Sequence, residues 1–471
     1  MKFKILSHAG LLVEHNGINL ICDPWILGSS YWRSWWNYPP VSKDLVNSLK
    51  PDFIYLTHIH WDHFHSPSLE KFDRQTQFIV PKGNYSRIKT DLVKLGFKNV
   101  IELKHGECFK LADNFTLTSY QFGVFLDSAA LIEADGVKLL NLNDSKHMGA
   151  TLKQIVNKHK PIDFVFRSHS SANSRLSYHI IDKPETVSDD IEKYIENFAD
   201  TVIATGAKYA IPFASNHCHL HKDTYHYNSY IQSPDMVREY FVKHNISNPK
   251  VQVMLSGDSW SKDEGFNVSD KDWFTDKEAL LLDYRNENSE KLNAFYAQEE
   301  KTKLPLKVVQ NYFKKLSEAT PALLRRYFKG QRFTYVLRLT DDKHLIFELD
   351  FYNGTVVELE NYDDVSNPIQ IHTTAFIMLR CIAFGIFSHM SIGKRVSYRV
   401  RSDKKKYMEM LNSVFNLYEY DMIPFKKNFS SRSLETWRLR WREIFLYFSL
   451  VKDKMVTGKM DMKKYLKPFN G

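Results

Sequence analysis

Cysteine is scarce in this 471-residue sequence, and long apolar runs are missing. The wide spacing of its four cysteines excludes a disulfide framework and a structural zinc knuckle. This spacing is typical of a protein of the reducing cytoplasm. No run of eighteen apolar residues occurs, so no transmembrane segment is predicted. Ser7 and His8 interrupt the first apolar residues so early that we expect no signal peptide and a cytoplasmic location. The four cysteines, none in a Cys-x-x-Cys pair, are Cys22, Cys108, Cys218 and Cys381.

Charge is distributed unevenly along the chain. The net charge is +9, and the content of 43% hydrophobic and 14% aromatic residues is that of a globular protein. Residues 291–471 hold 32 Lys and Arg against 19 Asp and Glu, whereas residues 1–290 hold 32 against 36. A chain of this length exceeds one ordinary core. We therefore predict two domains, 1–290 and 291–471, with the positive charge on the second.

Three histidines and an aspartate follow the apolar run 53–56 within six residues: His58, His60, Asp62 and His63. The run reads as a strand, and alternate side chains of an extended chain point the same way, so His58 and His60 project to one point. If the chain then turns into a helix, Asp62 and His63 reach a second point nearby. Imidazoles and carboxylates bind both zinc and iron, so the spacing predicts a site for two divalent metal ions. A histidine-rich surface loop is the alternative.

The pattern His-x-His-x-Asp-His after an apolar strand resembles the signature of the metallo-β-lactamase superfamily. The resemblance implies an α/β fold, an αββα sandwich with one or two metal ions at the edge of its sheets. It also implies an aspartate that bridges the two ions. The match assigns that role to Asp144, which ends the apolar alternation 137–142.

The sequence departs from the superfamily at one expected ligand. Most members place a histidine on the strand that here holds Gln121, a neutral and weak ligand. Another residue must then complete the first metal site, and the candidates are His169, His147 and His179. We favour His169 because it follows the short strand 164–166.

A second histidine cluster, His217, His219 and His221, follows a predicted helix at 185–205 and a strand. The segments Ser7-His8-Ala9-Gly10, Cys22-Asp23-Pro24-Trp25, Trp35-Trp36 and Ile211-Pro212-Phe213 resemble CMP-N-acetylneuraminate hydroxylase-like proteins, over about residues 1–260. That resemblance makes His221, rather than its two neighbours, the ligand of the second metal. Those hydroxylases also carry a Rieske iron–sulfur domain, whose Cys-x-His and Cys-x-x-His ligands do not occur here. Electrons for an oxygenase reaction would come from a separate partner.

The segment from Trp25 to Pro40 is rich in aromatic residues around Arg33. Such rings can line a cleft and stack on a substrate, and Arg33 can bind a phosphate or carboxylate. We therefore predict Arg33, Trp35 and Trp36 as substrate-binding residues. An aromatic plug that holds the loop in place is the alternative.

Beyond residue 290, helices at 305–317 and 320–328 precede three alternating strands and an apolar helix at 373–387. This α+β pattern over 300–400 is faintly similar to sterol-carrier-type domains. The chain ends in a basic, aromatic stretch around 438–442. We interpret this stretch as a solvated helical face, with nucleic-acid binding as the weaker alternative.

These residues predict a metal-dependent hydrolase that uses metal-activated water on an ester, phosphoester or amide, with Asp62 positioning the water. The same ligands suit iron, so an iron oxygenase is the alternative, and a non-catalytic binding module is a third class. We expect two divalent ions, Zn or Fe. The expected partner is a small molecule such as a sugar nucleotide or a lipid headgroup.

Overall fold

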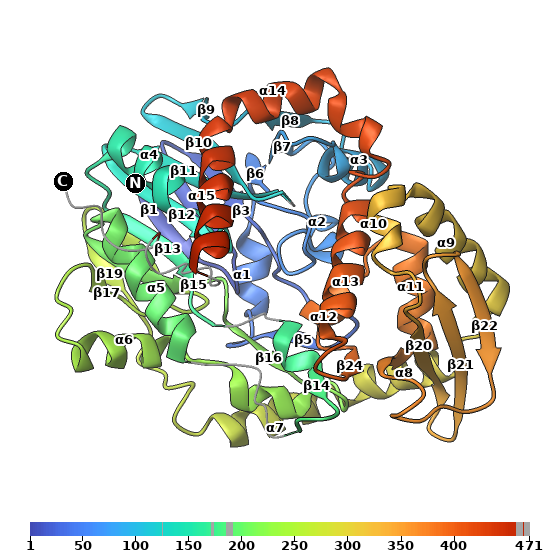
Figure 1. Ribbon diagram of the computed structural model, residues 1–471. Helices are drawn as coiled ribbons and strands as arrows, with labels where there is room; N and C mark the ends of the chain where they lie inside the picture. The colour runs from blue at the N-terminus through green and yellow to red at the C-terminus, as the bar shows by residue number, and fades with distance from the viewer. Residues whose placement is uncertain (125, 171–173, 185–191, 458–464, 466–471) are drawn as a thin grey trace.

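Two β-sheets packed face to face form the centre of the larger part of the molecule in this computed structural model (Figure 1). The structure describes residues 1–124, 126–170, 174–184, 192–457 and 465. The first sheet has the order β19-β18-β1-β2-β3-β6-β7-β8. Its strands are β1 (Lys2–Ile5), β2 (Leu11–His15), β3 (Ile18–Cys22), β6 (Phe53–Tyr55), β7 (Gln77–Pro81), β8 (Val100–Leu103), β18 (Ser259–Ser261) and β19 (Gly265–Asn267).

The second sheet has the order β17-β15-β13-β12-β11-β10-β9. Its strands are β9 (Glu107–Ala112), β10 (Phe115–Phe122), β11 (Asp127–Ala134), β12 (Val137–Asn143), β13 (Phe164–Ser168), β15 (Tyr209–Phe213) and β17 (Lys250–Val251). A small third sheet joins β4 (Ser29–Ser30), β5 (Trp35–Asn37) and β16 (His217–His219).

Apolar side chains on both faces of each sheet explain the layered arrangement. The inner faces share one buried cluster that includes Phe3, Val13 and Phe166. The outer face of the first sheet is covered by α1 (Lys43–Ser48), α2 (Ser66–Leu69) and α3 (Arg87–Lys94). The outer face of the second is covered by α4 (Gly149–His159), α5 (Glu192–Thr205) and α6 (Pro234–Lys243). The predicted αββα sandwich is confirmed; of the predicted helix 185–205, residues 185–191 lie outside the described residues.

Parallel strands bring the polar loops to one rim. Strands β3, β6, β7 and β8 run parallel, as do β12, β13, β15 and β17. The carboxyl ends of parallel strands meet at the same edge of a sheet, which is where ligands bind in such folds. Asp23, His58, Asp144 and His169 all follow such ends. A hydrogen bond of 2.5 Å from Asn143 Nδ2 to Asp23 Oδ2 joins the rims of the two sheets.

The C-terminal half has its own sheet, with the order β14-β24-β23-β20-β21-β22. Its strands are β14 (Tyr178–Ile180), β20 (Phe333–Thr340), β21 (Lys343–Asp350), β22 (Thr355–Leu359), β23 (Ile369–Thr374) and β24 (Ser397–Val400). Its helices and the linking ones are α7 (Lys277–Glu287), α8 (Ser289–Glu300), α9 (Leu306–Ala319), α10 (Ala322–Arg326), α11 (Ala375–Phe384), α12 (Ser388–Ile392) and α13 (Lys405–Glu419). The predicted strands are present, but the apolar helix begins at Ala375 because residues 369–374 form β23.

The chain crosses the predicted domain boundary at residue 290 twice. Strand β14, from the first half, is the edge strand of the C-terminal sheet through parallel pairing with β24. Helices α14 (Ser431–Leu439) and α15 (Trp441–Thr457), from the second half, return to the sandwich, where α15 contacts α4 (Figure 1). The two halves of the chain are therefore interleaved in space. The domain boundary at residue 290 stays a prediction.

The basic stretch near the C-terminus is anchored by ion pairs to the sandwich. Arg432 binds Glu102 with two hydrogen bonds of 3.2 and 2.5 Å. Buried Arg440 pairs with Glu443 at 2.6 Å and donates to the carbonyl of Gly123 at 2.7 Å. At least two of these arginines thus hold the returning helices in place. No helix in the described ranges is long and apolar enough to cross a membrane.

Candidate metal centre

The loop after β6 turns at His60. The amides of His63 and Phe64 both donate to the His60 carbonyl, at 3.0 and 2.7 Å. On one side of the turn, His58 Nε2 and His60 Nδ1 lie 2.9 Å apart. On the other side, the His63 ring centroid lies 4.1 Å from that of His58. The extended segment followed by a turn therefore brings three imidazoles together, as the spacing suggested.

Asp23, at the end of β3, organises this loop. Its carboxylate accepts hydrogen bonds from the amide and the hydroxyl of Thr57, at 2.8 and 2.7 Å. It also lies 3.0 Å from His63 Nδ1. A carboxylate on one imidazole nitrogen orients the ring and leaves the other nitrogen as the ligand. Asp23 therefore directs His63 Nε2 toward the centre.

Two overlapping groups of possible ligands share His63. One consists of His58, His63 and Asp144, and the other of His8, Asp62 and His63. Within each group, the ligand atoms all lie within 4.8 Å of one another. His8 is 1%, Asp62 3% and His63 0% exposed, so these groups are removed from bulk water. Two adjacent sets of imidazole and carboxylate are the arrangement that a dinuclear site requires.

The contacts within these groups fit bound cations better than hydrogen bonds. Asp62 Oδ2 lies 3.1 Å from His8 Nε2 and 3.3 Å from His63 Nε2, and Asp144 Oδ2 lies 3.3 Å from the same His63 nitrogen. Yet neither nitrogen forms a hydrogen bond of acceptable geometry with any described residue. Two ligands of one tetrahedral zinc ion lie roughly 3.3 Å apart without bonding to each other. The residues present therefore fit divalent metal ions.

The electrostatics of the centre is dominated by burial and by the carboxylates. Burial by itself would lower the pKa of His63, but Asp62 and Asp23 outweigh it and raise that pKa well above its usual value. Burial, together with the neighbouring His63 and His60, lowers the pKa of His58 well below its usual value. Metal binding needs neutral imidazoles. A cation in this place would substitute for the proton that Asp62 and Asp23 hold on His63.

His60 and Asp144 form the accessible side of the centre. Both are partly exposed, and the Asp144 side chain retains 27% of its accessible surface. His60 belongs to neither group, and Asp144 is the one member of the two groups that is not buried. A substrate would therefore approach from the His60 and Asp144 side.

The structure places His221 away from these groups, which differs from the prediction. Its Nε2 lies 3.3 Å from Glu299 Oε2 of α8, and its ring packs edge-on against Tyr296 at 4.8 Å. His217 lies nearer, with its ring centroid 5.5 Å from that of His8. The reason is the strand β16, which directs His217 toward the centre and ends before His221. His217 is therefore the better candidate ligand from this segment.

The candidates for the missing ligand on β10 have different surroundings. Gln121 donates to the Leu103 carbonyl at 2.9 Å, so its amide nitrogen is engaged in the sandwich. His169 is buried near His8, and burial lowers its pKa to about 3. His147 packs against Phe122 and hydrogen-bonds Ser145, while His179 is exposed on β14. Of the three, His169 is the one whose pKa is lowered in part by the charge of His8, one of the candidate ligands.

The two predicted tryptophans point to opposite faces of β5, because side chains alternate along a strand. Trp35 stacks on His217, with centroids 3.7 Å apart and planes 12° from parallel. Trp36 is 1% exposed and belongs to a core with residues of α7 and α8. Trp35 therefore faces the centre and Trp36 faces away from it, and both are buried, at 1% exposure each. Arg33 is partly exposed and donates to Ser29 Oγ at 3.0 Å.

Tyr31, Trp32 and Arg33 form a strained turn, with φ values of 49°, 56° and 64°. Non-glycine residues rarely adopt this left-handed conformation, and each costs about 1–2 kcal/mol. The turn places the Tyr31 hydroxyl on Asp62 Oδ1 at 2.5 Å. Tyr31, Trp32 and Trp35 are also part of the buried cluster of the C-terminal half. The loop is thus the aromatic plug that the sequence left as an alternative, and it also positions Asp62.

The C-terminal half reaches the centre through α12. Its His389 ring lies 5.6 Å from that of His60 and 5.0 Å from that of Trp61. Burial, with the charges of His60 and Arg87, lowers the pKa of His389 well below its usual value, and the Ile59 carbonyl opposes this shift. This half of the chain therefore packs against His60 and Trp61.

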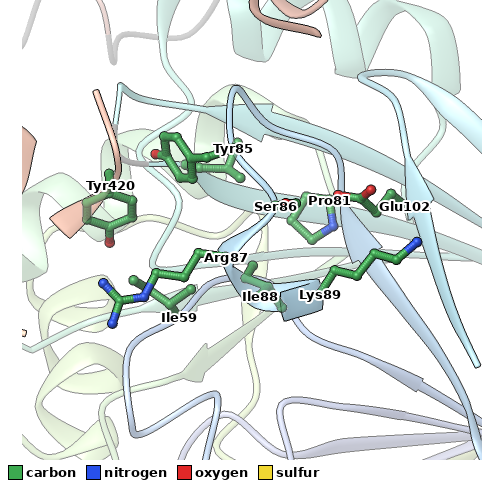
Figure 2. Close-up of a pocket in the computed structure, with 10 residues that line it drawn as sticks. Ile59, Pro81, Tyr85, Ser86, Arg87, Ile88, Lys89, Glu102 and Tyr420 are labelled. Carbon is green, nitrogen blue, oxygen red and sulfur yellow. The ribbon is translucent and has the colours of Figure 1, made fainter. Parts of the chain in front are cut away.

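Arg87 of α3 holds the C-terminal half in this position. Its guanidinium donates to the carbonyls of Phe384, Gly385 and Glu419, at 2.7 to 2.9 Å. Figure 2 shows the Arg87 side chain beside Ile59 and Tyr420, in a small hollow with about 10 Å³ of free volume. A hollow of that size holds one water molecule at most. The contact is therefore a closed interface, and the hollow is too small for a substrate.

Four residues of the centre were not singled out from the sequence as ligands or site residues: His8, Tyr31, His217 and His389. His8 stood in a segment that resembled the hydroxylase-like proteins, and His217 stood in the second histidine cluster. Tyr31 was visible only as one of several aromatic residues. His389 carried no local signal, because it approaches His60 across 329 positions of the sequence.

Comparisons with known proteins agree with the fold. No model of a protein family matches the chain. The chain is 24% identical over 245 residues to a Mycobacterium tuberculosis protein named for a Rieske 2Fe-2S iron–sulfur centre, covering 48% of this chain and 46% of that protein. It is 28% identical over 146 residues to the cytidine monophosphate-N-acetylneuraminic acid hydroxylase of Gorilla gorilla gorilla, covering 30% and 24%. The chain thus spans less than half the length of these relatives.

Among the solved structures similar to this chain, one has a stated fold and another has a stated activity. One is the metallo-β-lactamase fold protein YhfI from Bacillus subtilis, with 14% identity and a TM-score of 0.36, covering 55% of this chain and 98% of that one. The other is CmlA, a diiron β-hydroxylase from Streptomyces venezuelae, with 14% identity and a TM-score of 0.37, covering 55% and 53%. The predicted resemblance to hydroxylase-like proteins is confirmed by the partial sequence matches.

Proposed function

We propose that this chain, a metallo-β-lactamase-fold relative of CMP-N-acetylneuraminate hydroxylase-like proteins, is a metal-dependent hydrolase that acts on a small molecule. The observation that carries the proposal is the convergence of His8, His58, Asp62, His63 and Asp144 at one rim of the sandwich. These side chains come from three loops, after β1, β6 and β12, and neither His8 Nε2 nor His63 Nε2 hydrogen-bonds any of the described residues.

The residues divide into two sides. His58 and Asp144, with His60 beside His58, would help to hold one ion, and His8, Asp62 and His63 would hold the other. Such ions supply Lewis acidity and a water whose pKa is lowered to about 7. Asp62 would orient that water, because its Oδ1 accepts from the Tyr31 hydroxyl and its Oδ2 lies 3.1 and 3.3 Å from His8 and His63 Nε2. The Tyr31 hydroxyl stays protonated, since burial and Asp62 raise its pKa well above the usual value.

An iron oxygenase is the second candidate. The observation that favours it is the sequence similarity to a named hydroxylase and to a Rieske-named protein. The same imidazole and carboxylate ligands suit iron as well as zinc. In that case a separate protein of the electron-transfer class would supply the electrons.

The substrate we propose is a small molecule with an anionic group, such as a sugar nucleotide or a lipid headgroup. It would enter on the accessible side formed by His60 and Asp144. The partly exposed Arg33 is the candidate for contact with its anion, whereas Trp35 and Trp36 are both buried.

Metal analysis of protein purified without oxygen tests the proposal. We expect about two ions per chain, zinc for the hydrolase and iron for the oxygenase. His58→Ala and Asp144→Asn should each lower the metal content, whereas His344→Ala, at an exposed position on β21, should leave it unchanged. Wild-type protein that binds no divalent ion, with Kd values above the millimolar range, would refute both candidates and favour a non-catalytic binding module.

A further inference from the structure

Helix α15 presents large aromatic side chains to solvent along one face. Trp441, Phe445 and Phe448 are 48%, 62% and 67% exposed. They lie at positions i, i+4 and i+7, so they form one stripe, which we call the aromatic ridge. Of the six exposed Phe and Trp residues in the described parts of the chain, five fall between residues 425 and 448. Exposed apolar side chains gathered in this way mark an interaction surface.

The opposite face of α15 is fixed to the sandwich. Leu446 is buried in a cluster with Phe122, at the end of β10, and with Met148, just before α4. Buried Glu443 accepts a hydrogen bond of 2.9 Å from the Gly123 amide. Figure 1 shows α15 lying across the sandwich beside α4. The helix is therefore held by one face, and the aromatic ridge remains available for another partner.

The surroundings of the aromatic ridge are basic. Among residues 425–452 whose burial is described, every exposed side chain is apolar, serine or basic, and none is acidic. Glu435 binds two lysines at 2.7 Å each, and Glu443 binds buried Arg440. Lys427 pairs with Asp421, whereas the other exposed basic residues form no ion pair with a described residue. The exposed basic residues are Lys426, Lys427, Arg438 and Lys452.

An anionic lipid surface complements both properties. Phenylalanine rings have no hydrogen-bonding atoms, and the acyl region just below the headgroups offers them apolar volume. Lysine and arginine beside them are attracted to the lipid phosphates. The Arg442 guanidinium lies 4.7 Å from the Trp441 ring, and tryptophan is typical of the headgroup level. A nucleic-acid duplex would match the charge but offers no apolar volume for Phe445 and Phe448.

We propose that the aromatic ridge and its basic neighbours dock this chain on the surface of an anionic lipid bilayer, with α15 lying in the plane of the interface. The proposal does not depend on the metal-dependent function. It does place the docking face near the metal centre, because α15 packs on Met148, in the segment that follows Asp144.

The test is cosedimentation of the full chain with phosphatidylcholine vesicles that contain about 30% phosphatidylserine. We expect binding to these vesicles that salt weakens, and much weaker binding to phosphatidylcholine alone. Phe445→Ser combined with Phe448→Ser should weaken binding about tenfold or more. Arg438→Gln should weaken it about fivefold, and it serves if the double variant does not fold. Leu323→Ser, at a position 82% exposed on α10, is the matched control and should bind as the wild type does.

A second readout reports the depth of the ridge. Of the nine tryptophans, Trp441 is the one that is exposed, so bromine-labelled acyl chains should quench its fluorescence, and Trp441→Phe should lose that quenching. Absence of binding to anionic vesicles, or equal binding by the double phenylalanine variant, would overturn the proposal. So would a dimer that dissociates in that variant, which would assign the ridge to a second copy, or tighter binding to a DNA duplex. None of these results bears on the metal content, so the proposed function is tested separately.

Discussion

Replacement of Arg395 by alanine should disturb both stability and the metal centre, although Arg395 contacts none of the candidate ligands. Its guanidinium is 1% exposed and donates to Glu299 at 2.7 Å and to the Trp32 carbonyl at 2.8 Å. The first bond joins α8 to the segment before β24. The second holds the left-handed turn that carries Tyr31.

The magnitude follows from what the substitution leaves behind. Removal of one partner of a buried ion pair costs about 3–5 kcal/mol, because the other charge stays buried. Glu299 keeps Thr374 Oγ1 at 3.1 Å and His221 at 3.3 Å, so we expect the lower end, about 3 kcal/mol. The turn of three left-handed residues stores a further cost of about 3–6 kcal/mol in total. Without the bond to Trp32 it can relax, and Tyr31 then withdraws from Asp62.

Urea unfolding followed by tryptophan fluorescence, together with a metal titration, measures both effects. Arg399→Ala is the matched control, because Arg399 pairs with Asp364 at 3.1 Å while 44% exposed. Exposed pairs contribute about 0–1 kcal/mol, so this variant should unfold almost as the wild type does. If Arg395→Ala were no less stable than Arg399→Ala and bound metal with wild-type affinity, the reasoning that Arg395 holds the turn of Tyr31 in place would be refuted.

Two further predictions concern Tyr31 and Glu419. Tyr31→Phe should weaken metal binding about 10–100-fold in a chelator competition, since Asp62 loses the donor that orients it. Tyr312→Phe is the control, because the buried hydroxyl of Tyr312 has no partner among the described residues. Equal metal affinities of the Tyr31→Phe and Tyr312→Phe variants would contradict the prediction. Burial raises the pKa of Glu419 from 4.5 to about 8. The folded state therefore binds the carboxyl proton more tightly than the unfolded state does. The contribution of this proton to the free energy of unfolding is fully present below pH 4.5 and is lost as the pH rises toward 8. Glu419→Gln should flatten the fall in stability between pH 4.5 and 8 in urea titrations, and an unchanged slope would count against the shift.

The fold and one part of the centre could be predicted from local sequence, for a physical reason. A strand followed by a turn is specified by neighbouring residues, so the period of two and the apolar run before His58 were sufficient to predict that His58, His60 and His63 would converge. The same argument applies to Asp144, which ends an apolar strand. Asp23 also ends one, but its contact with His63 depends on the packing of two segments 40 positions apart.

Other features depended on pairing between distant segments. The period of two in β5 implied that Trp35 and Trp36 point apart, but only the pairing with β16 showed which face meets the centre. His217 and His221 are equivalent by composition, and the end of β16 separates them. Resemblance alone had favoured His221, which instead lies among the charges of Glu299 and Arg395.

By itself, the sequence determined the ligand-rich turn after β6 and the strand ends that carry Asp23 and Asp144, because these follow from short-range periodicity, whereas the sandwich was implied by the resemblance to a known superfamily. Only the tertiary structure decided which distant groups gather around that turn: His8 from the first loop, Tyr31 from a strained turn and His389 from the C-terminal half. Their positions result from sheet pairing and from the packing of one half of the chain on the other. Such contacts carry no periodic signal in the residues around them.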